Sequence, residues 1–401
     1  MTTDEKQSDK LPFGALLALA MTGFICIVTE TLPAGLLPEI GSGLGVSASF
    51  AGQMVTVYAL GSLLAAIPLT IATQSWRRRT VLLMTIVGFL VFNSVTALSS
   101  NYWLTLIARF FAGVSAGLAW SLVAGYARRM VVPQLQGRAL AVAMVGTPIA
   151  LSLGVPLGTW LGGFMGWRMA FGLMSGLTLL LIVWVLIKVP DYPGQSSSQR
   201  MALRQVFLTP GVRSVLGVVF TWMLAHNILY TYVAPFVSEA GLANDVDLVL
   251  LAFGVAALAG IWVTGRLVDR HLRKTVLASL ATFAAVSVFF GLFSGSALAI
   301  YIGVSIWGLT FGGAATLLQT ALADSAGKGA DVALSMNVVV WNSAIAGGGL
   351  LGGVLLGQWG VSAFPWVLLM LLLLSLAIAS RARVHGFASG DRQSGLIVAG
   401  H

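Results

Sequence analysis

Twelve continuous apolar runs, separated by polar connections, constrain this chain more than any other feature of its sequence. An α-helix rises about 1.5 Å per residue, so a run of about 20 residues can cross the hydrocarbon core of a bilayer. The runs lack the alternation of apolar and polar residues that marks a transmembrane β-strand. Only 9% of the residues are charged, whereas a soluble protein carries about 25%. The sequence therefore predicts an all-α polytopic membrane protein.

The ends of the apolar runs set the boundaries of the expected spans. These spans are residues 12–37, 50–73, 80–99, 103–127, 139–163, 168–189, 213–237, 248–268, 275–293, 297–322, 332–357 and 362–380. The first run is too long for the core of a signal peptide, so we expect it to stay in the protein as the first helix.

One longer connection divides the chain near its middle. It begins with prolines, glycines and serines and continues as a basic stretch, which is typical of a linker. We therefore expect an N-terminal six-helix bundle at 1–189, a cytoplasmic linker at 190–212, a C-terminal six-helix bundle at 213–381 and a cytoplasmic tail at 382–401.

The positive charges fall almost entirely on one side of the expected membrane. With the N-terminus placed in the cytoplasm, 20 of the 22 lysines and arginines lie on the cytoplasmic side, and only Arg109 and Arg168 do not. This asymmetry predicts that both termini are cytoplasmic. The net charge of +9 is then a topology signal that also favours anionic lipid, and it does not indicate a nucleic-acid partner.

The two halves of the sequence repeat each other. At an offset of 195 residues the segment RRTVL at 78–82 falls on RKTVL at 273–277. The same offset superposes glycines of the fourth and fifth spans on glycines of the tenth and eleventh, for example Gly113 on Gly308 and Gly154 on Gly349. Two pseudo-symmetric six-helix bundles in parallel repeat resemble the architecture of the major facilitator superfamily, whose substrate site lies between the halves.

Glu30 is an acidic residue inside the first span. On insertion scales such a residue costs about 2.5–3.5 kcal/mol, so an intramembrane acid is by default a candidate for function. The other interpretation is that Glu30 lies near the outer end of the helix and reaches water.

The fourth and fifth spans carry two motifs. Residues 109–117, RFFAGVSAG, resemble the fourth-helix motif of proton-coupled members of the superfamily. The resemblance implies a role for Arg109 in proton coupling, and Glu30 is the nearest intramembrane acid by depth. The alternative is an arginine that binds carbonyl groups and water for structure alone. In the fifth span the Gly–Pro pattern of Gly154, Pro156 and Gly158 resembles the antiporter motif, although small-residue stripes also serve simple packing.

A third motif lies in the loops between the second and third spans of each half. The second half has the superfamily pattern Gly265, Asp269, Arg270. In the first half Gln74 stands where the acid is expected, so the usual charge lock of this loop lacks its carboxylate.

Taken together, residues 11–381 resemble the twelve-helix drug/metabolite:proton antiporter family. The segments TETLPAGLLP at 29–38 and GWR at 166–168 most resemble its branch of sugar-efflux and purine-ribonucleoside-efflux transporters. The resemblance implies a monomeric, multi-pass protein of the bacterial cytoplasmic (inner) membrane.

Polar and aromatic residues at helical spacing within the spans are the candidate substrate contacts. Trp222, His226 and Tyr230 recur at spacing four on the seventh span. Amides and tryptophans are tolerated in hydrocarbon where they face a cavity and can bond to or stack on a ligand. Taken singly, each also fits a packing role. The candidates are Gln53, Tyr58, Trp120, Trp222, His226, Asn227, Tyr230, Gln319, Asn337, Trp341 and Asn342.

Three functions explain these features to different extents. A proton-coupled antiporter that exports a small organic solute, such as a drug, sugar or nucleoside, explains Glu30, Arg109 and the antiporter motif together. A proton-independent facilitator or importer of the same fold is the alternative. An intramembrane enzyme or scaffold has the least support, because the sequence offers no zinc-binding His–Glu pair, nucleophile motif or phosphate loop.

We therefore expect a transporter with no catalytic residues, no cofactor and no metal. The single cysteine, Cys26, excludes a disulfide framework. The expected partners are the solute, protons and membrane lipids. The candidate contacts hold few charges, so the expected solute is neutral, cationic or zwitterionic.

Overall fold

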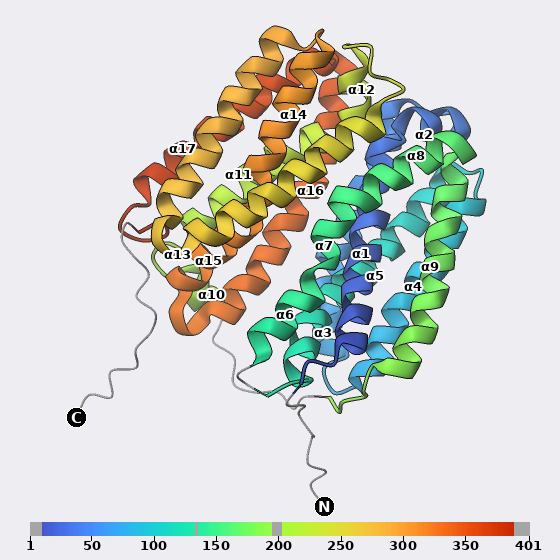
Figure 1. Cartoon of the computed structure of the whole chain (residues 1–401), viewed down its shortest axis with the longest axis vertical. Helices are drawn as coiled ribbons and strands as arrows, with labels where there is room; N and C mark the ends of the chain where they lie inside the picture. The colour runs from blue at the N-terminus through green and yellow to red at the C-terminus, as the bar shows by residue number, and fades with distance from the viewer. Residues whose placement is uncertain (1–9, 133–134, 195–202, 389–401) are drawn as a thin grey trace, which may run out of the picture.

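The structure of the chain, a computed structural model, describes residues 10–132, 135–194 and 203–388 (Figure 1). In this part of the chain twelve helices are long and apolar enough to cross a membrane. Each overlaps one of the predicted spans, so the predicted fold class is confirmed. The linker prediction at 190–212 and the tail prediction at 382–401 fall partly outside the described residues, and the domain boundaries stay a prediction.

The helices are arranged along the chain as follows. The N-terminal half contains α1 (Phe13–Gly35), α2 (Leu37–Leu44), α3 (Ala48–Ala72), α4 (Arg78–Leu98), α5 (Tyr102–Arg129), α6 (Gln136–Met144), α7 (Gly146–Ile149), α8 (Val155–Met165) and α9 (Trp167–Lys188). After α10 (Leu203–Phe207), the C-terminal half contains α11 (Val212–Thr231), α12 (Val233–Ser238), α13 (Val246–Phe293), α14 (Ala297–Gly312), α15 (Ala314–Ala326), α16 (Ala330–Trp359) and α17 (Phe364–Arg381).

Several spans are interrupted, and the local sequence explains each interruption. The fifth span runs from α6 to α8 and contains a π-helical turn at Ala150–Gly154. Proline has no N–H to donate, so Pro148 and Pro156 weaken the helical ladder on either side of this turn. The tenth span breaks between α14 and α15 at Gly313. Helix α13 contains the eighth and ninth spans, which meet at His271 with non-helical angles of φ −133° and ψ 29°.

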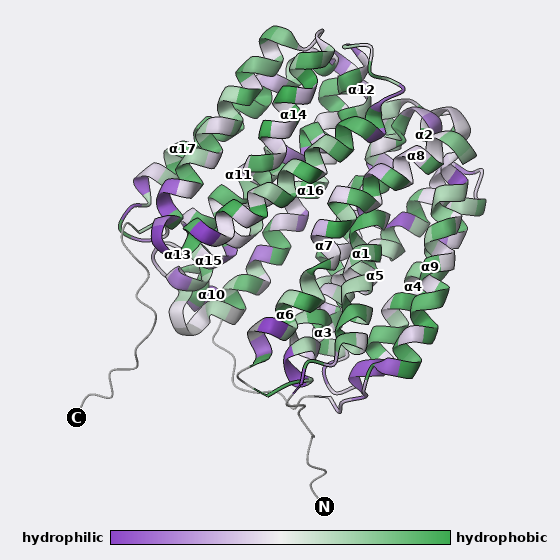
Figure 2. Cartoon of the chain, viewed as in Figure 1, coloured by the Kyte–Doolittle hydropathy of each residue, from purple (hydrophilic) through white to green (hydrophobic). Residues whose placement is uncertain are grey.

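The two halves lie side by side and are pressed together at one end. Figure 1 shows α1–α9 as one bundle and α11–α17 as the other, with the start of α1 and the end of α17 towards the same end of the molecule. We call this the linker end, and the opposite end, where α2 and α12 lie, the far end. Across the boundary α3 packs against α16, and α8 and the π-helical turn pack against α13. Figure 2 shows hydrophilic residues gathered mainly at the linker end.

Hydrogen bonds close the boundary near the far end. The hydroxyl of Ser49 on α3 donates to the carbonyl oxygen of Gly353 on α16 at 2.6 Å. The hydroxyl of Tyr232, between α11 and α12, donates to the carbonyl oxygen of Gly349 at 2.7 Å. The side-chain amide of Gln53 lies between them and donates to Gly349 and Tyr232 at 3.3 and 3.4 Å. We call these five residues the far-end clamp.

The internal repeat of the sequence is visible in the packing of glycines against backbone. In the first half a Cβ on Gly113 would collide with the carbonyl group of Tyr58. In the second half a Cβ on Gly308 would collide with the carbonyl group of Phe253, and both pairs are related by the same offset of 195 residues. The close approach of α5 to α3 is therefore reproduced by α14 and α13.

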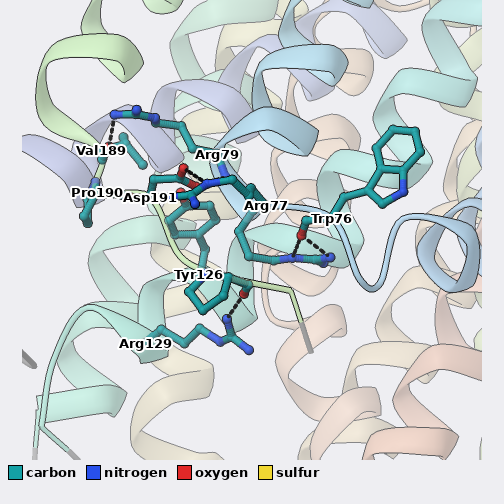
Figure 3. Close-up of polar contacts among 10 residues, drawn as sticks. Trp76, Arg77, Arg79, Tyr126, Arg129, Val189, Pro190 and Asp191 are labelled. Carbon is teal, nitrogen blue, oxygen red and sulfur yellow. Dashed lines mark hydrogen bonds and ion pairs between the residues drawn. The ribbon is translucent and has the colours of Figure 1, made fainter. Parts of the chain in front are cut away.

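The start of the connection after α9 is tied to the loop between α3 and α4 (Figure 3). Oδ2 of Asp191 pairs with Nε of Arg77 at 2.5 Å. Oδ1 of Asp191 accepts a hydrogen bond from the backbone N–H of Arg79, in the first turn of α4, at 3.2 Å. The hydroxyl of Tyr126 on α5 donates to the carbonyl of Pro190 at 2.6 Å. A carboxylate from the connection thus serves the loop whose own acid is replaced by Gln74.

A related contact occurs in both halves, in which an arginine near the loop after the second span donates to a carbonyl of the chain that follows the sixth span. In the first half the backbone N–H of Arg78 donates to the carbonyl oxygen of Tyr192 at 2.9 Å. At the offset of 195 residues, Nη1 of Arg273 donates to the carbonyl of Phe387 at 3.0 Å. In each half the loop after the second span therefore holds the chain that follows the sixth.

We expect the substitution Asp191→Ala to destabilise the folded protein by about 1 kcal/mol. The change removes a half-exposed ion pair, which contributes little, and an anion at the first turn of α4, which contributes about 0.3–1 kcal/mol. Thermal unfolding of the purified protein in detergent measures the loss.

Two variants control this experiment. Asp191→Asn keeps an oxygen acceptor and should lose less stability than Asp191→Ala. Glu239→Ala, at an exposed carboxylate beyond α12, should leave the unfolding midpoint unchanged. Equal midpoints for Asp191→Ala and the unaltered protein would contradict the anchoring role.

Candidate functional site

Pro33 interrupts the hydrogen bonding of α1 near its end, and Arg109 fills the gap. Because proline has no N–H, the carbonyl of Thr29, four residues earlier, receives no helical hydrogen bond. Nη1 of Arg109 donates to that oxygen at 2.6 Å, and Nη2 donates to the carbonyl oxygen of Glu30 at 3.3 Å. Nε of Arg109 donates to the carbonyl oxygen of Met54 on α3 at 3.3 Å. One fully buried guanidinium therefore joins α1, α3 and α5.

Aromatic rings cover the remaining surface of the guanidinium. Its central carbon lies 4.7 Å from the ring centroid of Tyr58 and 5.6 Å from that of Phe171. Such cation–π contacts stabilise a desolvated charge by about 2 kcal/mol. The Tyr58 hydroxyl also donates to the carbonyl oxygen of Cys26 on α1 at 2.9 Å. Tyr58, a predicted substrate contact, is thus fully buried within the N-terminal half and supports Arg109.

The carboxylate of Glu30 has no ion pair within 4.0 Å in the described part of the chain, and its side chain is only 8% exposed. Glu30, the nearest intramembrane acid by depth, therefore makes no salt bridge with Arg109 in this structure. Three of the five N–H groups of the guanidinium instead donate to backbone carbonyl oxygens. This geometry is the one expected of a structural arginine, although the two side chains still interact electrostatically. The role of both residues in proton coupling stays a prediction.

Tyr230 is the residue of the C-terminal half that lies near Glu30. Helices α1 and α11 are in contact, and the Tyr230 side chain lies beside Thr31 and within electrostatic range of Glu30. The Tyr230 hydroxyl is buried within reach of the Thr31 side chain, and it makes no hydrogen bond of standard geometry in the described part of the chain. The carboxylate therefore lies at the boundary between the two halves.

An aromatic cluster surrounds His226 one turn away from Tyr230. The His226 and Phe311 rings stack face to face, with centroids 3.4 Å apart and planes 4° from parallel. The centroids of Trp307 and Tyr230 lie 5.2 Å from that of His226, and the centroid of Phe253 lies 5.9 Å away. These five residues come from α11, α13 and α14, and we call them the His226 cage.

Several polar atoms in and beside the His226 cage are buried without a hydrogen-bond partner among the described residues. They are Nδ1 of His226, Nε1 of Trp307, the hydroxyl of Tyr230 and Nε1 of Trp222. Trp222 lies one helical turn before His226 on α11, so the two side chains are neighbours on one face. A buried donor or acceptor left unpaired costs about 1–3 kcal/mol. Such a concentration of unpaired groups is the feature expected of a binding site.

Some of the remaining candidate amides make hydrogen bonds within the fold, and others do not. Gln53 is part of the far-end clamp. The side chains of Asn227 and Asn342 donate to the carbonyl oxygens four residues earlier in their own helices, at 2.7 and 2.9 Å. Oδ1 of Asn337 is buried and has no hydrogen-bond partner within the described ranges, whereas Gln319 on α15 is exposed.

The two remaining tryptophans are half-buried. Trp120 on α5 packs beside Gly23 of α1, within the N-terminal half. Trp341 on α16 packs against a small apolar group that joins α3 to α16. Trp222, His226 and Tyr230 thus lie on one face of α11, whereas Gln53 belongs to the far-end clamp, Trp120 packs within the N-terminal half and Gln319 is exposed on α15.

The conformational motifs occupy two places in the fold. Gly154 and Gly158 face Val28 and Leu32 of α1, and Pro156 opens α8. The other side of this span meets the C-terminal half, where Gly254 of α13 packs on the π-helical turn. Gly265, Asp269 and Arg270 lie on α13 before its bend at His271. The side chain of Asp269 lies outside the described residues.

Sequence reasoning missed seven residues of the clamp and the cage, which are Ser49, Tyr232, Gly349 and Gly353 in the clamp and Phe253, Trp307 and Phe311 in the cage. Tyr232, Trp307 and Phe311 stand in apolar runs with no polar spacing to mark them. Phe253 had a signal, because it is related to the candidate Tyr58 by the offset of 195 residues.

Comparisons with known proteins agree with this architecture. The sequence model of the Major Facilitator Superfamily matches residues 19–348. The purine ribonucleoside efflux pump NepI of Escherichia coli is 31% identical over 379 residues, which cover 93% of this chain and 94% of the pump. The same pump of Shigella flexneri matches with the same identity and coverage.

A solved structure has the same fold. The crystal structure of the human organic anion transporter MFSD10 (TETRAN) superposes with a TM-score of 0.69 over 93% of this chain and 100% of that one, at 18% identity. With a family match over most of its length and twelve membrane-spanning helices, this chain belongs to the Major Facilitator Superfamily and is a multi-pass membrane transporter, not an enzyme.

Proposed function

We propose that this transporter exports a small, uncharged organic solute of the nucleoside kind across the bacterial cytoplasmic membrane in exchange for protons. The observation that carries the proposal is the Glu30 carboxyl, buried at the boundary between the halves without an ion pair among the described residues. An ionised carboxylate costs about 2.5–3.5 kcal/mol in a membrane helix. A group that gains and loses a proton as its surroundings change can therefore couple proton movement to rocking of the halves.

The proposed cycle uses contacts on both sides of the boundary. When the far-end clamp opens, Tyr230 withdraws from Glu30 and the carboxyl meets water on that side, where it takes up a proton. When the clamp closes, the proton leaves towards the linker end. Arg109 stays fixed on α1 by its carbonyl contacts and supplies a constant positive charge beside the carboxyl. Protonation and solute binding compete, so each cycle exchanges one for the other.

Orientation follows from the distribution of charge. Basic residues gather at the linker end, and the positive-inside rule assigns that end and both termini to the cytoplasm. The far-end clamp then faces the outside, and its closure in this structure corresponds to a site reached from the cytoplasm. In this proposal the protein acts as a monomer, surrounded by lipid.

The substrate class is supported by the relatives and by the chemistry of the C-terminal half. The similar pumps of Escherichia coli and Shigella flexneri are named for purine ribonucleosides. The unpaired groups near His226 are uncharged donors and acceptors, which suit a neutral solute with several polar atoms.

We expect Glu30→Gln to abolish export driven by a pH gradient, because the amide cannot bind and release a proton. Uptake of radiolabelled adenosine into everted vesicles, with and without an imposed gradient, measures the effect. The gradient should increase the initial rate of the unaltered protein by about tenfold, which corresponds to about 1.4 kcal/mol. It should leave the variant unchanged, while exchange of labelled for unlabelled adenosine continues.

Glu239→Gln is the matched control, because Glu239 is an exposed carboxylate outside the spans. It should retain the full response to the gradient. A full response in Glu30→Gln would overturn the antiport mechanism. It would favour the second candidate, a proton-independent facilitator, to which the carbonyl-bound Arg109 also conforms.

We expect Tyr232→Phe to shift the protein towards the state open at the far end. The variant loses the hydrogen bond to the Gly349 carbonyl, which contributes about 1 kcal/mol, or about a fivefold change in population. Spin labels on Ser42→Cys and Asn244→Cys, exposed at the far end of opposite halves, can be placed in a Cys26→Ser background. Their distance distribution should gain a longer component.

Tyr301→Phe makes the same chemical change on α14, away from the boundary. It should leave the distance distribution unchanged. An unaltered distribution in Tyr232→Phe would mean that the clamp does not set the balance between the two states.

A further inference from the structure

The His226 cage is packed differently from an ordinary apolar core. Its central pair, His226 and Phe311, forms an almost perfectly eclipsed stack, with centroids 3.4 Å apart. Aromatic pairs prefer offset or edge-to-face arrangements, because the quadrupoles of eclipsed rings repel. The other ring pairs of the cage have centroids at least 4.5 Å apart, for example Trp307 and Phe253, whose planes are inclined at 54°. The His226–Phe311 stack is therefore the contact that is most easily exchanged for another.

Phe311 is also the member of the cage with the most freedom to leave. Its side chain is half-buried, whereas His226, Phe253 and Trp307 are buried. It lies next to Gly312 and Gly313, where α14 ends and α15 begins. The helix break lets this ring move without disturbing a continuous helix.

The repeat of the chain places the cage at the counterpart of the Arg109 site. The offset of 195 residues relates Tyr58 to Phe253 and Glu30 to Ala225, next to His226. Trp307 and Phe311 stand where the first half has Ala112 and Ala116. The first half fills this junction with a guanidinium bound to carbonyls, and the second half fills it with rings that carry unpaired polar atoms.

We propose that the His226 cage binds the flat, uncharged, nitrogen-containing ring of the solute, which stacks on His226 in the place of Phe311. This inference rests on the proposed function and extends it to a specific binding site. Indole Nε1 groups of Trp222 and Trp307 can only donate hydrogen bonds, and Tyr230 can donate as well. The bound ring must therefore offer acceptor atoms, such as ring nitrogens or a carbonyl oxygen.

A cationic ligand fits the cage less well. Aromatic rings alone attract a quaternary ammonium ion. Such an ion has no acceptor atoms, however, so the buried N–H groups of Trp222 and Trp307 would stay unpaired. The donors therefore select a neutral heteroaromatic ring over a cation.

The test measures ligand binding to the purified full-length protein in lipid nanodiscs by calorimetry. The probes are adenosine, phenyl riboside, whose flat ring has no acceptor atom, and tetraethylammonium. The substitution Trp307→Phe keeps an aromatic ring and removes its N–H. We expect it to weaken adenosine binding about tenfold and to leave phenyl riboside binding unchanged.

The substitution Phe311→Ala separates an exchanged ring from a structural one. If the ligand takes the place of Phe311, removal of the competing ring should strengthen adenosine binding about threefold or more. If Phe311 is a fixed wall of the site, the same change should weaken binding. Phe311→Leu gives a second variant that preserves more apolar volume, and it should act in the same direction. Phe293→Ala, at an exposed ring on α13, is the matched control and should change nothing.

The outcomes distinguish this inference from the proposed function. Adenosine export that persists with unaltered affinity in Trp307→Phe and Phe311→Ala would overturn the cage as the binding site and leave the function intact. Preference of the unaltered protein for tetraethylammonium over adenosine would overturn both the cage assignment and the nucleoside class.

Discussion

The contact between Arg109 and the carbonyl oxygens of α1 is the interaction on which the rest of the structure depends. Pro33 leaves the Thr29 carbonyl without its helical partner, and an unpaired carbonyl in hydrocarbon is costly. Arg109 satisfies that oxygen, and the carbonyls in turn satisfy a buried charge. Each of these groups would be unstable without the other. The exchange fixes α1 against α3 and α5, and it thereby fixes Glu30 at the boundary between the two halves.

Polar side chains at the far end of the boundary between the halves have hydrogen-bond partners, and polar atoms further in, around His226, differ in this respect. In the far-end clamp the polar side chains of Ser49, Gln53 and Tyr232 all have hydrogen-bond partners. Around His226 several buried polar atoms have no such partner in the part of the chain that the structure describes. A boundary with this distribution is stable where it must seal and incomplete where a solute can contribute the missing bonds. In the proposed cycle, closure of the clamp seals the far end while a solute from the linker end fills the cage.

Composition and periodicity predicted the twelve spans and the repeat, because the bilayer imposes length and apolarity on every span. They also identified Glu30 and Arg109, since charge is rare within a membrane helix. They did not predict how the two meet, because the freed carbonyls that bind Arg109 are backbone groups with no signature of their own beyond Pro33. Asp191 escaped notice for a similar reason. It replaces a missing loop acid from a distant part of the chain, and no local pattern links it to Arg77.

The repeat explains why one junction of the fold can serve two purposes. Gly113 and Gly308 bring equivalent helices to the same close approach in the two halves, so the backbone at each junction is nearly the same. The side chains then decide its use. A buried arginine needs backbone acceptors and immobilises the helix that supplies them, which suits the fixed partner that we propose for the Glu30 carboxyl. Rings such as Trp307 and Phe311 need only shape and a few hydrogen bonds, so they can exchange one partner for another. Different side chains at equivalent helix junctions thus give a rigid, charged site in the first half and an uncharged site of aromatic rings in the second.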